Sequence, residues 1–127
     1  MEKTKYYAYF FTRQDLSPEQ QLVQTAHAAL KMGYYSNYAK KAEEGKETIP
    51  YRSSDMNPDE TYFTCVGVRN LDALEGVRMI LDKFGYGYEV FIEPDIGNEI
   101  TSIALYPVAE YNRGPLLAFN LLKMARI

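Results

Sequence analysis

Two side chains in this sequence are suited to nucleophilic or acid–base chemistry, and each occurs once. They are His27 and Cys65. A histidine can act as a general base or orient a nucleophile, and it can equally be a half-buried helix residue bonded to a backbone carbonyl. Paired with Cys65 it would form a nucleophile with its base. A cysteine within an apolar strand is more often an inert, buried hydrophobe, so the structural interpretation is favoured for both residues.

Two carboxylates and a threonine stand at the ends of apolar runs. Asp15 follows the run 6–12, Asp95 follows 86–92, and Thr101 lies at the start of 100–106. If the first two runs are parallel strands, both acids lie beyond the carboxyl edge of the sheet, where α/β proteins bind ligands. Each residue also has an ordinary role, because aspartates cap helices and form turns and threonine favours strands.

Tyrosine is unusually frequent, with twelve residues and no tryptophan. Several tyrosines and lysines cluster after the first helical segment: Tyr34, Tyr35, Tyr38, Lys31, Lys40 and Lys41. Aromatic rings among lysines can stack on bases and neutralise phosphate. Tyrosine is also favoured at protein–protein interfaces, and the same pattern fits a solvated helix face. All three interpretations remain open.

The periodicity of apolar residues predicts the elements that must position these groups. Strands are expected over 6–12, 61–68, 86–92 and 100–106, and helices over 18–33, 36–44, 71–84 and 116–124. The first helix should bury an apolar face against the sheet, formed by Leu22, Val23, Ala26, Ala29 and Leu30. Gly33 is expected to end or bend this helix. The polar segment 45–60 should be a surface connection.

The order of these elements predicts an α/β fold. Strand–helix–strand units imply parallel pairing with right-handed crossovers, whereas the short turn over 93–98 implies antiparallel final strands. We therefore expect one domain over 1–127, a three-layer α/β/α sandwich around a small four-stranded mixed sheet.

Composition narrows the possible functions. The 127 residues carry a net charge of −3, which excludes a uniformly basic nucleic-acid coat. A single cysteine excludes an internal disulfide and any multi-cysteine metal site. Apolar runs are too short for a membrane span, and the N-terminal run is strand-like and ends in charge. The sequence has no glycine-rich phosphate loop, so we expect no cofactor. We also expect no metal, no membrane contact and a cytoplasmic location.

Two stretches resemble motifs of the archaeal and eukaryotic-type (type 2) peptidyl-tRNA hydrolases. Residues 13–16 (RQDL) and 24–29 (QTAHAA) are similar to the first motif, in which a strand ends in Arg-x-Asp-Leu and the next helix carries Gln-x-x-His-Ala. Residues 95–107 (DIGNEITSIALYP) are similar to the Asp-Ala-Gly loop and closing strand. The predicted element order also matches, so the resemblance spans nearly the whole chain.

The resemblance implies cleavage of the ester bond between peptide and tRNA. It assigns three catalytic positions: Asp95 to position water, Thr101 to assist, and His27 to shape the site. It implies a set of substrate-binding positions as well: Asp15, Arg13, Ser17 and Asn98. It requires no cofactor or metal.

The sequence departs from the family at the position that follows Asp-Leu. The family has a lysine there, within a lysine- and glycine-rich loop, whereas this chain has Ser17 followed by Pro-Glu-Gln. The loop before the closing strand is shorter, and Asn98 is the nearest stand-in for the family's threonine. Because lysine–phosphate contacts dominate tRNA binding, hydrolysis should be slow or absent.

Two hypotheses follow. The chain is a divergent peptidyl-tRNA hydrolase, or it is a non-catalytic descendant that binds a protein or RNA. The second includes a homodimer through the tyrosine-rich surface. A negatively charged crevice would favour the second hypothesis.

Overall fold

The computed structural model describes residues 4–44 and 57–121, with side chains described over 4–36 and 57–119. The elements in these segments are β1 (Tyr6–Arg13), α1 (Pro18–Glu44), β2 (Thr61–Val68), α2 (Leu71–Lys83), β3 (Tyr88–Glu93), η1 (Pro94–Ile96), β4 (Glu99–Leu105), β5 (Val108–Ala109), η2 (Glu110–Asn112), η3 (Gly114–Leu116) and α3 (Leu117–Leu121). The three η elements are short 3₁₀ helices.

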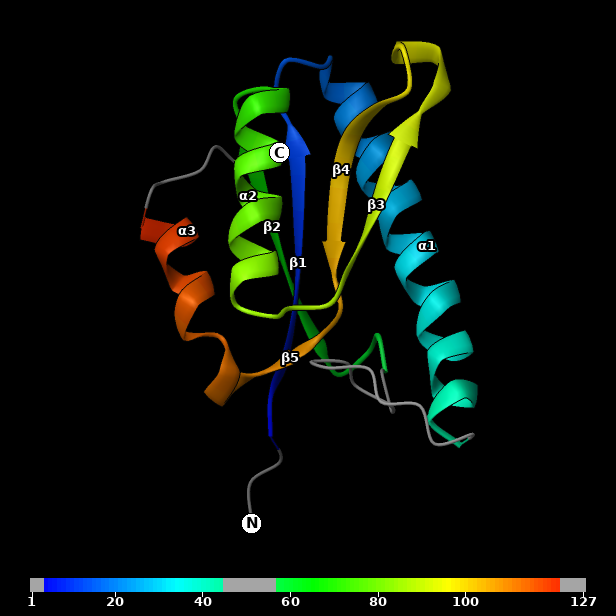
Figure 1. Ribbon diagram of the computed structural model, residues 1–127, viewed down its shortest axis with the longest axis vertical. Helices are drawn as coiled ribbons and strands as arrows, with labels where there is room; N and C mark the ends of the chain where they lie inside the picture. The colour runs from blue at the N-terminus through cyan, green and yellow to red at the C-terminus, as the bar shows by residue number, and fades with distance from the viewer. Residues whose placement is uncertain (1–3, 45–56, 122–127) are drawn as a thin grey trace.

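The strands form one mixed sheet with β1 inside it (Figure 1). The main path is β2-β1-β4-β3, and β5 pairs with the first two residues of β1. β1 and β2 are parallel, whereas β4 is antiparallel to both β1 and β3. Therefore β1, β2 and β3 point the same way, and their carboxyl ends share one sheet edge with the beginning of β4.

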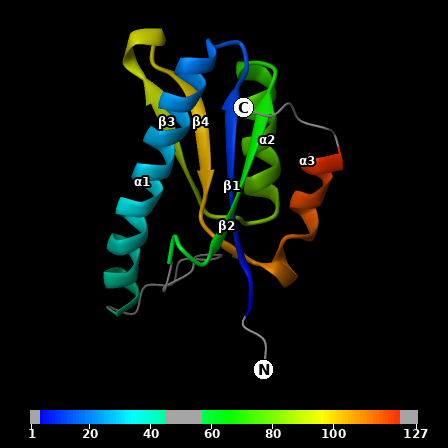
Figure 2. The same cartoon turned by 180° about the vertical axis from the view of Figure 1, so that it is seen from behind.

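Helices cover both faces of this sheet. α1 lies on one face and α2 and α3 lie on the other, as Figures 1 and 2 show from opposite sides. This arrangement confirms the predicted α/β fold with a mixed sheet. The described sheet has one short strand more than the four expected, because β5 extends the pairing at the start of β1.

β1 supplies side chains to both layers of the core. Tyr9 and Phe11 are fully buried in the cluster under α2 and α3. Ala8 and Phe10 point to the other face and pack with Met32 of α1. A strand buried on both faces has no room for charge, which explains the uncharged run over 6–12.

The boundaries largely follow the sequence signals. The hydroxyl of Ser17 accepts a hydrogen bond from the Gln20 N–H at 3.2 Å, at the predicted helix start. The side chain of Asn70 accepts one from the Ala73 N–H at 3.0 Å and caps α2. β3 begins two residues later than predicted and β4 begins one residue earlier. The last predicted helix starts instead as the 3₁₀ turn η3.

Gly33 does not end the first helix, so the prediction of two separate helices is wrong. α1 is a single helix from Pro18 to Glu44, and the two predicted segments are parts of it. A glycine within a helix costs only about 1 kcal/mol relative to alanine, so the long flanking segments carry the helix through it.

The predicted apolar face of α1 is not the face that packs on the sheet, and this prediction is also wrong. Leu22, Val23 and Leu30 are exposed, whereas Gln21 and Gln24 are buried. The helix is rotated because the sheet below its N-terminal half presents hydroxyl groups, which need polar partners when they are buried.

Candidate functional site

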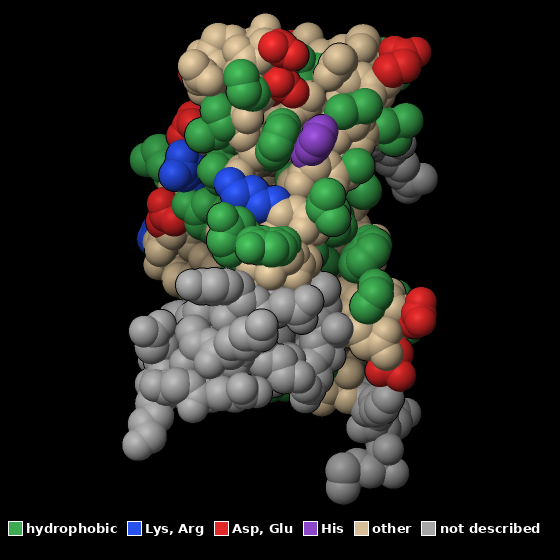
Figure 3. Space-filling view, turned by 90° about the vertical axis from the view of Figure 1, so that its right-hand side faces the viewer, with side chains coloured by type: hydrophobic (Ala, Val, Ile, Leu, Met, Phe, Trp, Pro, Cys, Tyr) green, Lys and Arg blue, Asp and Glu red, His purple; other side chains and the backbone are tan. Residues whose placement is uncertain are grey.

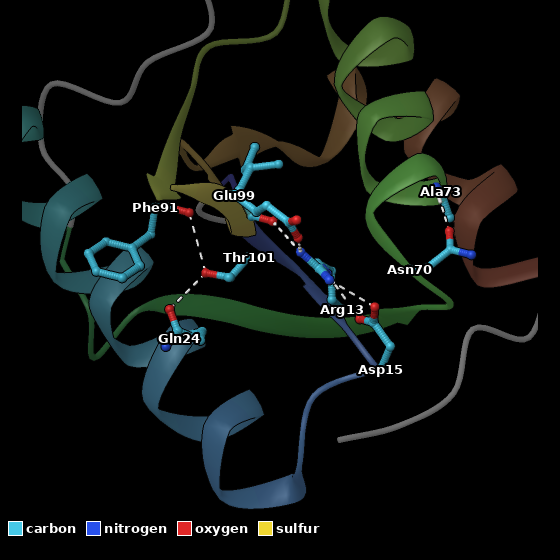
Figure 4. A network of polar contacts seen from close by, with 9 residues as sticks. Arg13, Asp15, Gln24, Asn70, Ala73, Phe91, Glu99 and Thr101 are labelled. Carbon is cyan, nitrogen blue, oxygen red and sulfur yellow. Dashed lines mark hydrogen bonds and ion pairs between the residues drawn. The ribbon is translucent and has the colours of Figure 1, made fainter. Parts of the chain in front are cut away.

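The predicted polar residues gather at the sheet edge where β1 and β3 end and β4 begins. Arg13 ends β1, Glu93 ends β3, and Glu99 begins β4. Segment 14–17 connects β1 to α1, and segment 94–98 connects β3 to β4. Figure 4 shows this edge with its polar contacts.

Arg13, at the end of β1, binds two carboxylates: that of Asp15, just after its own strand, and that of Glu99 on β4 (Figure 4). Its side chain donates to both oxygens of Asp15 at 2.9 and 2.8 Å, and to Glu99 at 2.7 Å. A further bond reaches the Ile100 carbonyl at 3.3 Å. Arg13 is only 6% exposed. Hydrogen bonding from Arg13 lowers the pKa of Asp15, and the same contact raises the pKa of Arg13. All three guanidinium nitrogens are therefore hydrogen-bonded within the protein.

A second chain of hydrogen bonds links β4, α1 and the end of β3. The Thr101 hydroxyl donates to Gln24 Oε1 at 2.7 Å, and its contact with the Phe91 carbonyl is 3.3 Å (Figure 4). Gln24 Nε2 donates to Glu93 at 3.0 Å. The bond from Gln24 lowers the pKa of Glu93. Thr101 and Gln24 are both fully buried, so these groups hold the three elements together.

A cluster of hydroxyl groups continues this polar layer below α1. Thr12 Oγ1 lies 2.6 Å from the hydroxyl of Thr25 and 2.8 Å from that of Ser102. Thr25 also donates to the Gln21 carbonyl at 2.7 Å. These contacts explain why the N-terminal half of α1 turns Gln21, Gln24 and Thr25 to the sheet, and leaves Leu22 and Leu30 exposed.

The proposed catalytic acid lies on the loop after β3. Asp95 is exposed, and its backbone N–H donates to Glu93 at 3.2 Å. Gly97 and Asn98 follow with positive φ angles of 65° and 58°, which make the tight return into β4. β4 separates β1 from β3, so Asp15 and Asp95 follow strands about 10 Å apart. The structure brings both acids to one edge, without placing them in one hydrogen-bonded group.

The other predicted substrate-binding residues lie on the same two loops. Ser17 is exposed, and its hydroxyl caps the start of α1. Asn98 is exposed, and its backbone N–H donates to the Glu93 carbonyl at 3.2 Å. Both residues therefore have a local structural role as well.

His27 is not the half-buried helix residue of the structural interpretation. It is exposed on α1, and its ring stacks on Phe91 of β3 with centroids 4.4 Å apart. Figure 3 shows the histidine at the surface, among hydrophobic side chains. The ring therefore packs on the α1 face of β3, away from the Arg13 group.

Cys65 is exposed, which corrects the expectation of a buried thiol. It lies on the edge strand β2, beyond the part of the sheet that α1 covers. Its pKa is raised by desolvation from neighbouring groups, which disfavours the nucleophilic thiolate. β2 and the β3 strand under His27 are three strand spacings apart, about 14 Å, so a Cys65–His27 pair is excluded.

The tyrosine cluster is partly described. Tyr34 is exposed, and its ring meets that of Tyr35 edge to face at 5.1 Å. Lys31 donates to the Val90 carbonyl at 2.9 Å and thereby protects the edge strand β3. The side chains of Tyr38, Lys40 and Lys41 lie outside the described residues.

The sheet edge is acidic. The segments 14–20 and 93–99 contain five acidic residues and no lysine or arginine. Arg13 is the cation between them, and two of the five carboxylates already contact it. The end of β2 adds Arg69 and Asp72, whose charges have opposite signs. A polyanion approaching this edge therefore meets mainly negative charge.

Other kinds of site were sought in the described segments. They contain no group of three or more histidine, cysteine or acidic side chains suited to a metal ion. Within the same segments no helix has the length and apolar character needed to cross a lipid bilayer.

Sequence reasoning missed the residues that organise this edge. Gln24, Glu93 and Glu99 were not assigned roles, although each bonds to a predicted site residue or to its loop. Gln24 was visible as the glutamine three residues before His27 in the first motif. The acids at 93 and 99 had no signal apart from their places at strand ends.

Comparison of the chain with protein-family models and with curated proteins finds no match.

Proposed function

We propose that this chain is a protein-binding module on a peptidyl-tRNA hydrolase-like framework, and that it does not hydrolyse peptidyl-tRNA. The observation that carries this proposal is the acidic sheet edge, in which Arg13 is held by Asp15 and Glu99 at 2.7 to 2.9 Å. A tRNA substrate needs cations that are free to contact phosphate. Here the guanidinium would first have to leave two carboxylates.

The burial and the hydrogen bond of the Thr101 hydroxyl support the same proposal. Its hydroxyl proton is directed to Gln24, and the side chain is fully buried. A group that stabilises a developing oxyanion must point at the reacting atom. Thr101 instead fastens β4 to α1, as a structural residue would.

An interaction surface is available on the side of α1 that points away from the sheet. Exposed aliphatic and aromatic residues occupy its outer side, among them Leu22, Leu30 and Tyr34. Contiguous exposed apolar patches on small proteins mark sites of contact with other molecules. This surface, and not the sheet edge, is the one proposed to bind a protein.

A hydrolysis assay tests the proposal. Purified full-length protein is incubated with an N-acetylaminoacyl-tRNA, and release of the amino acid is compared with spontaneous release in buffer. We expect no acceleration. A matched gain-of-function pair, Ser17→Lys and Ser17→Lys/Glu19→Lys, should raise tRNA affinity at least tenfold, because it restores cations at the loop. Turnover by the unmodified chain would refute the proposal.

Residual ester hydrolysis is a second candidate, and one observation favours it. The backbone of Asp95 is anchored through Glu93 and Gln24, and the exposed residue places its carboxylate at the edge, open to water. A carboxylate in such a position can orient an attacking water. If the chain has turnover, Asp95→Asn should abolish it, whereas Asp72→Asn, at another part of the edge, should not.

A further inference from the structure

Arg113 lies between the short helices η2 and η3, at the opposite end of β1 from the Arg13 group. β5, which leads into this segment, pairs with Tyr6 and Tyr7 at the start of β1 (Figure 1). The guanidinium of Arg113 lies over the Tyr7 ring, with 3.7 Å between its Cζ atom and the ring centroid. Its Nε and Nη2 atoms donate to the hydroxyl of the fully buried Tyr9 at 3.2 and 2.6 Å. Two tyrosines of β1 therefore fix the position of this half-buried side chain.

Arg113 differs from Arg13 in its counter-charge. Arg13 contacts the carboxylates of Asp15 and Glu99 at 2.8 and 2.7 Å. Among the described residues, no carboxylate forms an ion pair with Arg113. The bonds to Tyr9 use the Nε–Nη2 edge of the guanidinium, and the Nη1–Nη2 edge has no acceptor in the described part of the chain. This second edge carries two parallel N–H groups, the arrangement that binds carboxylate and phosphate oxygens.

Two stacked tyrosine rings join Arg113 to a second cation. The ring of Tyr62 on β2 stacks on that of Tyr7, with centroids 5.2 Å apart and planes inclined by 24°. The Nζ atom of Lys5 lies 5.9 Å from the centroid of Tyr62. Tyr62 is 52% exposed, and Lys5 is exposed as well. These four side chains, Lys5, Tyr7, Tyr62 and Arg113, form what we call the Arg113 surface.

The charges of the Arg113 surface match one doubly charged anion. Neither Lys5 nor Arg113 has a carboxylate partner among the residues that the structure describes. A phosphate monoester carries a charge of about −1.5 to −2 at pH 7, whereas a carboxylate carries a single charge. Glu110, whose backbone N–H donates to the Lys5 carbonyl, lies beside these cations. A chain of many phosphates would be repelled by this acid, so a single phosphate group fits better.

We propose that the Arg113 surface binds a phosphate monoester that carries an aromatic ring. The phosphate contacts the Nη1–Nη2 edge of Arg113, the aromatic ring lies against the exposed part of Tyr62, and Lys5 adds the second positive charge. Tyr9 is a positioning residue, because its hydroxyl holds the guanidinium in place. The acidic sheet edge lies at the other end of β1, so this inference goes beyond the proposed protein-binding function and does not depend on it.

An NMR titration of the full-length protein with phenyl phosphate tests the proposal. The reporter is the Nε–H signal of Arg113, which the bond to Tyr9 should protect from exchange with water and which Arg113→Lys removes. We expect a saturable shift with a dissociation constant of about 0.1 to 1 mM. Inorganic phosphate, which lacks the ring, and benzoate, which has a single charge, should each bind at least threefold more weakly. AMP should also bind more tightly than inorganic phosphate, and the tighter of AMP and phenyl phosphate identifies whether a nucleoside or a phenol carries the phosphate.

Three variants separate the parts of the site, with backbone amide shifts as the measure of binding. Arg113→Lys keeps the charge and removes the paired N–H groups, so it should weaken phenyl phosphate binding at least tenfold. Arg69→Lys is the matched control, because Arg69 is exposed just after the far end of β2, and it should leave the affinity unchanged. Tyr62→Leu should lower the affinity for phenyl phosphate to that for inorganic phosphate. Lys5→Met should weaken binding of both at least threefold and leave the melting temperature unchanged, because Lys5 is exposed.

Three outcomes would each overturn the proposal. They are the absence of a saturable shift, an equal loss of affinity in Arg113→Lys and Arg69→Lys, and an unchanged phenyl phosphate affinity in Tyr62→Leu. Because Tyr62→Leu and Lys5→Met keep the bonds between Arg113 and Tyr9, they test the site even if Arg113→Lys unfolds the protein. Turnover of peptidyl-tRNA, in contrast, would refute the proposed function and leave this site unaffected.

Discussion

Replacing Thr101 by valine removes one hydroxyl from the centre of the molecule with little change in volume. In the native protein this hydroxyl donates to Gln24 Oε1 at 2.7 Å, and both residues are fully buried. The variant therefore distinguishes a residue that fastens β4 to α1 from one that acts on a substrate. Only the first kind should change the free energy of unfolding.

The expected loss of stability follows from the contacts. A buried acceptor left without its donor costs roughly 1–3 kcal/mol. The added methyl group returns about 0.8 kcal/mol by burial. We therefore expect Thr101→Val to lower the free energy of unfolding by about 1 kcal/mol. For a domain of 127 residues, this corresponds to a decrease in melting temperature of about 4 °C.

A double-mutant cycle in urea isolates the Thr101–Gln24 contact. Gln24→Met removes the acceptor, and the double variant should show a coupling energy of about 1 kcal/mol, because the second change no longer leaves an unpaired partner. Thr101→Ser keeps the hydroxyl and should retain the coupling. A coupling near zero, or a Thr101→Val variant as stable as the wild type, would refute the structural role given to this hydroxyl.

Three further predictions concern other described contacts. Arg13→Met should lower the free energy of unfolding by about 1–2 kcal/mol at pH 7. It should also flatten the pH dependence of that free energy, because the lowered pKa of Asp15 contributes stability at neutral pH that is lost as the pH falls through that pKa. Urea unfolding at pH 6 and pH 3 measures this difference, and parallel pH profiles would contradict it. Asn70→Ala should remove about 1 kcal/mol by deleting the α2 cap, and an unchanged urea midpoint would contradict that assignment. Cys65 should react with a thiol reagent in the folded protein, faster at pH 9 than at pH 7; labelling only upon unfolding would show that it is covered.

The strands and helices could be predicted because their signals are local. The uncharged run over 6–12 and the Ser17-Pro18 helix start depend on neighbouring residues, and the structure has both elements at these positions. The strand β5 could not be predicted, since two residues carry no periodicity and pair only because β1 passes nearby.

The orientation of α1 could not be predicted from its own sequence. Apolar residues occupy both sides of this helix, so the choice depends on what the sheet presents below. The hydroxyls of Thr12 and Ser102 decide it, by requiring polar partners such as Thr25. The same limitation affects the candidate site, because the contact of Arg13 with Glu99 joins residues 86 positions apart.

The position of β1 inside the sheet affects how the chain is made. β1 is synthesised before both of its partners: it pairs on one side with β2, and on the other side its Phe10 meets Ala104 of β4, 94 residues later in the sequence. At 5–20 residues per second, about 5 to 20 s of synthesis separate these two partners. During that interval the aromatic segment over 6–12 has no β4 to pair with. Until β4 has been synthesised, a nascent chain of this protein therefore exposes one unpaired edge of an aromatic strand.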